Sequence, residues 1–333
     1  MIIIRQANYE DISRIMKFID DHWKKGHIMG NDRAMFEFQH VEGQEVHYVI
    51  AEDNSTKRIY GTMGYIPMNH SDTPDVFTVM ILTLRDSGHD FLGDEMSDWL
   101  EKELKIRYHV AVGINKRYAK AISVLEPGCI DTWNQYYRLA DRNKYKICKV
   151  FEKKISKVQK DTGCFLKNID CKDELASILG GIRLEELKPY RDERYILHRY
   201  WEHPVYEYQY FAIMNEEECK GLLIGRELDV CGTQCFRIVD FYGEANELRY
   251  IGNELDNIMK KKNYEYIDFC NFGIAPSLMR EAGFEIVGQD SNIIPHYFEP
   301  FEQRNIEIYV YSNSLKDITL FKAFSDQDRP NKI

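Results

Sequence analysis

The 333-residue sequence has no apolar run approaching the roughly 20 residues that a bilayer-spanning helix needs. Its opening segment, Met1–Gln6, is too short and too soon polar for a secretory signal, so it reads as a first strand. We therefore expect a cytoplasmic protein without a membrane partner.

The sequence also lacks a metal-binding motif and an excess of basic residues. Its eight cysteines are scattered, and only Cys231 and Cys235 lie close together, without the second pair or histidine cluster of a zinc site. We expect free thiols and no metal. The net charge of −10 argues against a nucleic-acid partner, which would require a basic face.

What is present is an ordinary globular composition, with 44% apolar and 29% charged residues, and a length sufficient for two domains. The acidic excess is unequal, with a net charge of −2 over residues 1–150 and −8 over residues 151–333. A phosphate-rich ligand should therefore bind more easily to the first part of the chain.

The first part alternates strand and helix signals. A strand at Ile2–Arg5 precedes an apolar stripe of helical period, and three extended runs follow. A polar loop then leads into a helix, a strand and a second helix. The expected elements after the first helix are Val46–Ala51, Arg58–Ile66, Val76–Leu84, Phe91–Leu104, Arg107–Gly113 and Asn115–Leu125.

The second part repeats this order. It begins with a hairpin and a third strand, continues with an amphipathic helix and a strand, and closes with a short helix before Gly283. The expected elements are Tyr208–Met214, Gly221–Leu228, Cys235–Phe241, Glu247–Lys261, Tyr264–Cys270 and Ala275–Glu281. Two copies of one order indicate a tandem repeat, with domains at 1–150 and 151–333.

These segments resemble the GNAT acyltransferase superfamily. The resemblance is carried by Ile4-Arg5-Gln6-Ala7 with Asp11-Ile12, by the hairpin that ends in Tyr60-Gly61-Thr62-Met63-Gly64, by Val76–Leu104, and by the closing Leu278–Glu285 segment. It implies an α/β (α+β) fold of two GNAT-like domains, each a mixed, mostly antiparallel sheet flanked by helices. It also implies acyl-CoA as a co-substrate, with no permanently bound cofactor.

The tandem arrangement and the segment Arg199–Tyr208 are similar to bacterial N-acyltransferases that act on nucleotide-linked amino sugars for polysaccharide biosynthesis. The anthrose-pathway type, whose acceptor is dTDP-4-amino-4,6-dideoxyglucose, is the nearest resemblance. It implies a coenzyme A thioester donor and an acceptor that lies between the two domains.

A phosphate cradle is expected where backbone N–H groups point outward at the start of a helix. Arg85, Gly88 and Gly93 lie at such a place, but Asp90 stands where the family has a small residue. An ordinary connection between strand and helix is the competing interpretation. The corresponding segment Asp240–Glu244 has acids on both sides, so we expect the second domain to have lost coenzyme A and to bind the acceptor.

A neutral amine attacks a thioester directly, and a carboxylate or imidazole takes its proton. Asp94 and Glu101 lie near one face of the expected helix, and His89 lies in the loop before it. We consider them in that order as the base. Acids in a first helical turn also occur simply because they favour the helix dipole.

Backbone N–H groups near Thr83 or Leu84 would meet the oxyanion, as the family implies. Asn115 resembles the asparagine that bonds the pantetheine arm, although it is equally well placed to cap a helix. For the acceptor, the candidates are aromatic, basic and amide side chains that could stack on or hydrogen-bond a nucleotide sugar. They are Arg199, His203, Tyr206, Tyr208 and Asn271.

Two other functions fit the same pattern. An aminoacyl-tRNA-dependent peptidyltransferase also has paired GNAT-like halves, but the negative charge opposes tRNA binding. A non-catalytic sensor of a small molecule is the other possibility, which the imperfect loop at residues 85–93 leaves open.

Overall fold

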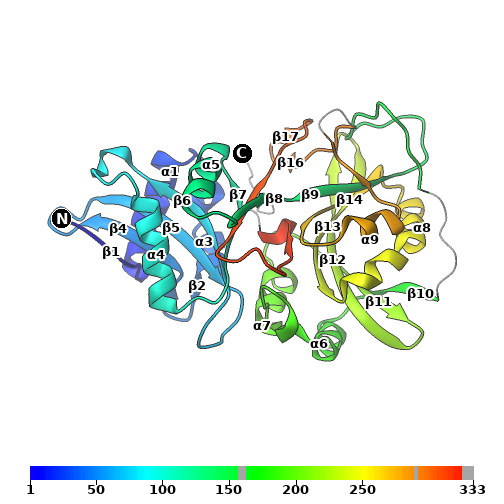
Figure 1. Cartoon of the computed structure of the whole chain (residues 1–333), viewed down its shortest axis with the longest axis horizontal. Coiled ribbons are helices and arrows are strands. Elements are labelled where there is room, and N and C mark those ends of the chain that lie inside the picture. Colours follow the sequence, from blue (N-terminus) through cyan, green and yellow to red (C-terminus); the bar gives the residue numbers. More distant parts are fainter. Residues whose placement is uncertain (157–162, 289–291, 325–333) are drawn as a thin grey trace.

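The computed structural model describes residues 1–156, 163–288 and 292–324, which form two α/β units side by side (Figure 1). Each unit is built on a mixed sheet in which neighbouring strands are antiparallel except for one parallel pair. The predicted fold class is therefore confirmed. None of the described helices is long and apolar enough to cross a bilayer.

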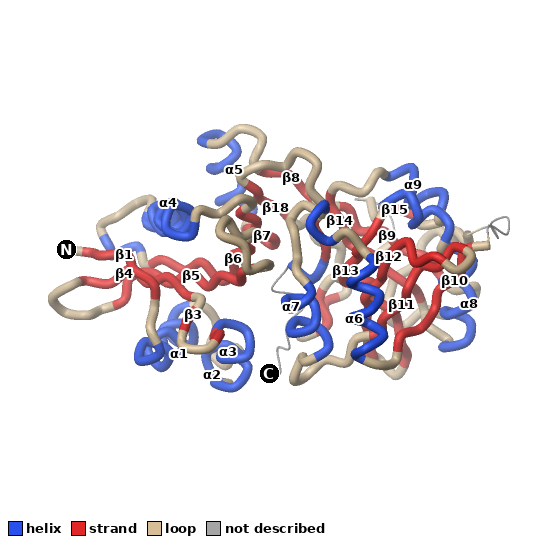
Figure 2. The backbone as a smooth tube through the Cα atoms, turned by 90° about the horizontal axis from the view of Figure 1, so that it is seen from below, coloured by secondary structure: helices blue, strands red, loops and turns tan. Residues whose placement is uncertain are grey.

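The first sheet has the strand order β1-β4-β5-β6-β7-β18-β8. Its strands are β1 (Ile2–Gln6), β4 (Tyr48–Asp53), β5 (Ile59–Pro67), β6 (Val76–Thr83), β7 (His109–Ile114), β18 (Tyr309–Ser312) and β8 (Ile130–Thr132). Figure 2 shows α1 (Ile12–His22), α2 (Ile28–Asn31) and α3 (Arg33–His40) on one face and α4 (Leu92–Leu104) on the other. α5 (Lys116–Leu125) follows β7, and the short pair β2 (Val41–Glu42) and β3 (Glu45–Val46) connects α3 to β4.

The helices of this unit follow the apolar stripes of the sequence. In α4, Leu92, Met96 and Leu100 are buried against the sheet, one turn apart. In α1, Ile12, Ile15 and Ile19 form the corresponding buried stripe on the opposite face. The sheet is thus covered on both faces, which fixes α4 beside the end of β6.

The second sheet has the order β10-β11-β12-β13-β14-β9-β15, and β19 pairs with β14 beside this path. Its strands are β10 (Cys164–Ile169), β11 (Gln209–Asn215), β12 (Glu218–Val230), β13 (Thr233–Gly243), β14 (Tyr266–Phe272), β9 (Asn134–Leu139), β15 (Glu285–Ile286) and β19 (Leu320–Phe321). The helices are α6 (Lys172–Gly181), α7 (Glu193–Ile196), α8 (Gly252–Lys262) and α9 (Pro276–Glu281). A small hairpin, β16 (Tyr297–Phe298) and β17 (Phe301–Glu302), completes the unit.

The two units exchange strands. β9 precedes residue 150 but pairs with β14 in the second sheet, and β18 comes from the end of the chain but pairs with β7 in the first. Each sheet therefore contains a strand from the other side of the expected boundary at residue 150. Such crossing connections hold the two units against each other.

The loop between β5 and β6 also joins the units. The buried Asp75 carboxylate accepts two hydrogen bonds from Arg107, at 2.8 and 2.6 Å, and one from the backbone N–H of Tyr190 at 2.5 Å. The backbone N–H of Asp192 donates to the carbonyl of Met68 at 2.9 Å. This loop therefore places α7 beside the first sheet.

Some elements differ from the sequence prediction. The expected helix over Glu247–Lys261 is divided into a 3-10 helix at Ala245–Tyr250 and α8, which starts at Gly252. The Arg199–Tyr208 segment begins inside a turn of π-helix, Leu197–Trp201. Glycine at the junction and the wider π turn are backbone features that side-chain periodicity does not reveal.

Candidate functional site

β6 and β7 run parallel for only a short distance. They pair at Val76 with His109 and at Phe77 with Val110, and the described residues show no pairing between them beyond these two positions. A bulge in the pairing of β5 with β6 accompanies the separation, and Met80 within it has a φ of +53°. A non-glycine residue in this region marks a constrained backbone and points to function. From Thr78 to Thr83, β6 still pairs with β5 but no longer with β7. We call the space along this edge of β6 the first strand gap.

The loop at the open end of this gap contains the predicted phosphate cradle. Arg85 lies in a short 3-10 turn that ends at Gly88, whose φ of +74° is in the region that favours glycine. Gly93 lies in the first turn of α4, where an added Cβ would be 3.6 Å from Ile81 Cγ2. Gly88 therefore shapes the exposed loop, whereas a Cβ at Gly93 would meet Ile81 at an ordinary van der Waals distance.

The two predicted oxyanion donors face opposite ways. The backbone N–H of Leu84 donates to the carbonyl of Tyr60 at 2.8 Å, so β5 already occupies it. Successive N–H groups of a strand point to opposite edges. The N–H of Thr83 is therefore directed toward the first strand gap.

Two acidic residues near the loop have identified partners, whereas Asp90, which stands where the family has a small residue, is exposed. Asp86 pairs with Arg58 at 2.7 Å. Asp94 accepts a hydrogen bond of 2.6 Å from the hydroxyl of Tyr118, which links α4 to α5. Burial, followed by this bond to Asp94, raises the pKa of Tyr118. Asn115 caps α5 by accepting from the N–H of Tyr118 at 2.9 Å, so its helix-capping role is observed directly.

The other two predicted bases lie in different surroundings. His89 forms an exposed pair with Glu95 at 3.2 Å. Glu101 accepts from Nδ1 of His109 at 2.6 Å, and Nε2 of His109 lies 3.1 Å from the hydroxyl oxygen of Thr78. The three candidates therefore do not converge on one point.

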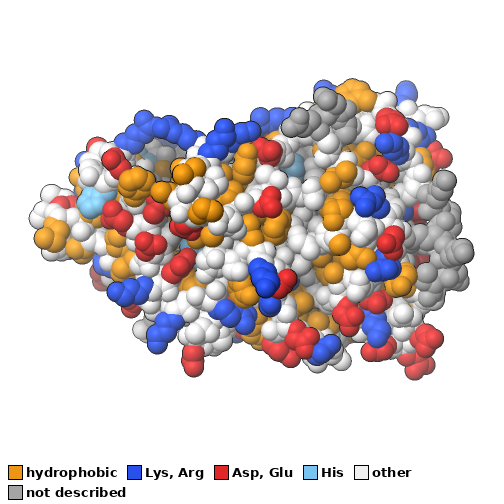
Figure 3. All heavy atoms as spheres, viewed as in Figure 1, with side chains coloured by type: hydrophobic (Ala, Val, Ile, Leu, Met, Phe, Trp, Pro, Cys, Tyr) orange, Lys and Arg blue, Asp and Glu red, His pale blue; other side chains and the backbone are white. Residues whose placement is uncertain are grey.

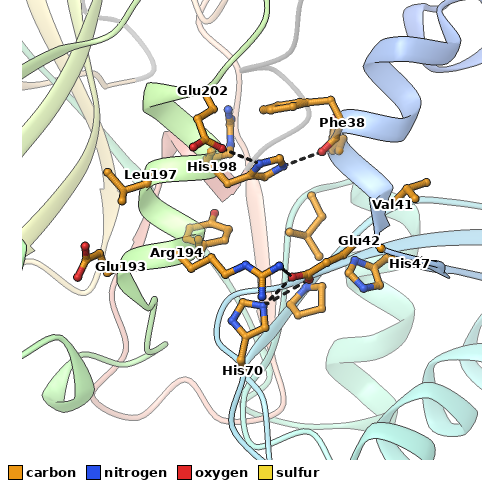
Figure 4. A pocket seen from close by; sticks show the side chains of 16 residues that line it. Phe38, Val41, Glu42, His47, His70, Glu193, Arg194, Leu197, His198 and Glu202 are labelled. Carbon is orange, nitrogen blue, oxygen red and sulfur yellow. Dashed lines mark hydrogen bonds and ion pairs between the residues drawn. The ribbon is translucent and has the colours of Figure 1, made fainter. Parts of the chain in front are cut away.

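A cavity of about 690 Å³ lies between the two units. It is lined from the first unit by residues of α3, β2 and β5, and from the second by residues of α7 and the π-helical turn. Its size falls in the range of small-molecule sites. Figure 4 shows Arg194 and His70 directed toward Glu42, and His198 between Glu202 and Phe38.

Charged groups from both units meet in this interdomain cavity. Nδ1 of His70 lies 2.6 Å from Asp192, its Nε2 lies 3.1 Å from Glu42, and Arg194 pairs with the same Glu42 carboxylate. Burial opposes the charged form of His70, but the bonds and charges of Asp192 and Glu42 outweigh it and raise its pKa. Burial lowers the pKa of His47, also in the lining, to about 4, so that it is a neutral imidazole near neutral pH.

Four of the five predicted acceptor residues cluster. Arg199 donates to the hydroxyl of Tyr208 at 3.2 Å, and the rings of His203 and Tyr206 stack with centroids 5.1 Å apart. Of these, only Arg199 lines the interdomain cavity. Asn271 lies elsewhere, in β14, paired with Asn134 and Phe321.

The second sheet has a corresponding strand gap, but it is filled. β13 and β14 pair over three residues and then part, and β19 occupies the free edge of β14. The rings of Phe321 and Phe269 stack with centroids 5.7 Å apart. The fully buried Arg191 lies over the Phe321 ring and pairs with Asp240. The protein's own chain therefore takes the place between these strands.

Among the described residues, no three histidine, cysteine or acidic side chains are grouped so that they could hold a metal ion. Neither models of protein families nor the curated proteins give a match to this sequence. Solved structures do give matches.

One is a GCN5-related N-acetyltransferase from Anabaena variabilis, with a TM-score of 0.54 and 10% identity over 93% of this chain and 72% of the other. Another is a conserved protein of Enterococcus faecalis described as a probable N-acyltransferase, with a TM-score of 0.58 and 10% identity over 95% and 73%. The fold is GNAT-like. At this identity, the likeness shows the fold and leaves the chemistry to the residues.

Residues whose partners are distant in the chain are absent from the sequence prediction. Glu42 pairs with Arg194 of the second unit, His70 pairs with Asp192, which is 122 residues away in the chain, and no local motif marks these pairs. His109 and Thr78 were also missed, although a histidine at the start of a strand that follows an acidic helix is a signal that could have found them.

Proposed function

We propose that this protein is a cytoplasmic N-acyltransferase that moves an acyl group from acyl-CoA to the amine of a nucleotide-linked amino sugar. The observation that carries the proposal is the first strand gap, with a glycine-shaped loop and the start of α4 at its open end. Unpaired strand edges offer backbone hydrogen bonds to an extended chain such as pantetheine. The start of a helix offers N–H groups to phosphate.

The surroundings of the gap support a phosphate-bearing donor. Lys116, Arg117 and Lys120 of α5 are exposed, and Figure 3 shows lysine and arginine side chains gathered along the molecular edge over α5. Asp86 in the same loop pairs with Arg58, which reduces the repulsion between its charge and a phosphate. We assign Arg85, Gly88 and Gly93 to the cradle, and the N–H of Thr83 to the thioester oxygen.

We infer a single donor site per chain from the second unit. Its strand gap contains β19, Phe321 and the buried Arg191–Asp240 pair, so an extended ligand would have to displace a packed core. The second domain is therefore assigned to the acceptor, in keeping with its greater negative charge.

We assign the acceptor to the interdomain cavity. Residues of both units line it, and Arg199 connects it to the stacked rings of His203 and Tyr206. The guanidinium of Arg226 lies 3.9 Å from the centroid of Tyr206, which makes this cluster both cationic and aromatic. Such a surface suits a nucleoside diphosphate, and dTDP-4-amino-4,6-dideoxyglucose is the acceptor that we propose. The sugar amine then attacks the thioester directly, with the base contributed by the α4 side of the sheet.

Thiol release from a panel of short acyl-CoA thioesters, measured with and without this nucleotide sugar, tests the proposal. We expect release that depends on the sugar, and a product heavier by one acyl group. Thiol release with other amines but not with this sugar would overturn the acceptor assignment. Coenzyme A binding without turnover on any amine would favour a sensor, and absence of coenzyme A binding would refute the donor assignment.

A pair of variants separates the two sites. Arg199→Met removes the cation shared by the cavity and the aromatic cluster, and it should raise the KM for the sugar with little change in donor affinity. Arg183→Met is the control, because the pair that Arg183 forms with Glu186 is exposed. Equal sugar KM values for both variants would contradict the acceptor placement.

A further inference from the structure

A line of three polar side chains, of which Thr78 and His109 are buried and Glu101 is partly exposed, reaches the closed end of the first strand gap. Thr78 of β6 follows the last residue that pairs with β7, and His109 is the first residue of β7. Glu101 projects from α4, the helix that covers this face of the sheet. Thr78 is 4% and His109 1% exposed.

The contacts fix the proton positions within this line. A carboxylate can only accept, so Nδ1 of His109 carries the hydrogen in its 2.6 Å bond to Glu101. In the neutral imidazole, Nε2 is then an acceptor, and the Thr78 hydroxyl 3.1 Å away donates to it. The ring of Tyr311 packs edge-on against His109 at 5.5 Å and restricts its rotation.

The order hydroxyl, imidazole, carboxylate is the arrangement that activates a hydroxyl for proton transfer. The neighbouring side chains on this face, including Val76, Leu92, Met96 and Leu100, are apolar. Burying the hydroxyl of Thr78 and the imidazole of His109 among them has a cost that packing alone does not explain. Glu101, expected as a direct base, instead contacts His109.

We propose that Thr78, His109 and Glu101 form the proton-transfer line of the acyl transfer, with Thr78 as the catalytic residue. The inference rests on the proposed function. As the neutral amine attacks, its C–N bond forms, its proton moves to the Thr78 oxygen, and the hydroxyl proton moves to Nε2 of His109. The C–S bond then breaks and the proton returns along the same line to the thiolate, so that amide and free thiol are the products.

Within this scheme, His109 and Glu101 are positioning residues that act through Thr78. Asp94 has a different role, because its carboxylate accepts from Tyr118 on the neighbouring helix. Thr78 is therefore the base in this scheme, and not Asp94, although Asp94 lies nearest to the start of α4.

Two substitutions at one position test the role of the hydroxyl. Thr78→Val removes it with little change in shape and should lower kcat by about 10²–10⁴-fold, with donor affinity nearly unchanged. Thr78→Ser retains it and should recover most of the activity. Thr62→Val on the adjacent strand is the matched control, because the Thr62 hydroxyl is buried and has no hydrogen-bond partner among the described residues.

Equal kcat values for Thr78→Val and Thr62→Val would overturn the proposal. A large fall of kcat in Asp94→Asn without a similar fall in Thr78→Val would also overturn it. A second measurement does not depend on turnover. Adding a non-hydrolysable acyl-CoA thioether to protein with ¹⁵N-labelled histidine should shift the His109 resonance, identified by its absence in His109→Gln. Donor binding that leaves this resonance unmoved would refute the line while leaving the proposed function intact.

Discussion

His47 offers a quantitative test of the interdomain cavity. It lies between β3 and β4, is 7% exposed, and lines the cavity. Burial lowers its pKa to about 4, with Glu42 opposing and His70 reinforcing the shift. An unfolded histidine titrates near 6.5. Between pH 6.5 and 4, the unfolded chain therefore binds more protons at this site, and acid favours unfolding.

The magnitude follows from the difference between these two pKa values. The contribution of His47 is present in full above pH 6.5, declines as the pH falls, and levels off below 4. By pH 4.5, the loss amounts to about 2.5 kcal/mol. His47→Gln removes the titrating group, so its free energy of unfolding should fall less between pH 7 and pH 4.5 by about that amount.

Urea unfolding at constant ionic strength measures this difference, with the carboxylates contributing equally to both proteins. His22→Gln is the control, because His22 is exposed, and it should keep the pH dependence of the original protein. Parallel pH dependence in His47→Gln and the original protein would refute the burial of a neutral imidazole beside the cavity.

Two further predictions concern the loop and the contact between the units. Gly88→Val forces a branched side chain into a φ of +74° and should lower stability by about 1–2 kcal/mol. It should also weaken coenzyme A binding, measured by calorimetry. Gly26→Val, at a φ of +78° in a remote loop, should show the stability loss alone. Because the pKa of His70 is raised, its pairing with Asp192 stabilises the fold fully below about pH 6.5, and this contribution is lost as the pH rises through the raised pKa. In His70→Asn, the free energy of unfolding should therefore depend less on pH between pH 6 and pH 9. An unchanged slope would contradict the pairing.

Local patterns in the sequence were sufficient for the elements around the first strand gap. A helix was expected over Phe91–Leu104, where α4 covers Leu92–Leu104, and Asn115 was recognised as a position that could cap a helix. Gly88 was selected from its place between strand and helix, and it does adopt a positive φ. These features depend on neighbours within a few residues.

Features that depend on distant partners could not be predicted. β9 and β18 are ordinary short strands in the sequence, and nothing local indicates that each pairs in the sheet of the other unit. The same holds for the interdomain cavity, where Glu42 pairs with Arg194 because the fold brings two distant segments of the chain together. Asp240 was interpreted as a charge unfavourable to phosphate, whereas it lies fully buried against Arg191.

The Arg191–Asp240 pair provides the last test, because it supports the chain segment that fills the second strand gap. Both side chains are fully buried, and Arg191 also lies over the rings of Tyr242 and Phe321. Asp240→Asn would leave a buried cation without its counterion, which typically costs about 3–5 kcal/mol. Arg191→Met combined with Asp240→Asn removes both charges and should be less destabilised than Asp240→Asn alone.

Urea unfolding of the two variants and of Glu186→Gln, which breaks an exposed pair with Arg183, measures these differences. If Asp240→Asn lost no more stability than Glu186→Gln, the pair would not hold Phe321 in place, and the argument for a single donor site would lose its support. A large loss in Asp240→Asn that the double variant relieves would show that the filled gap depends on this pair. Coenzyme A titration of the double variant should then still give one site per chain, because Phe321 remains between the strands.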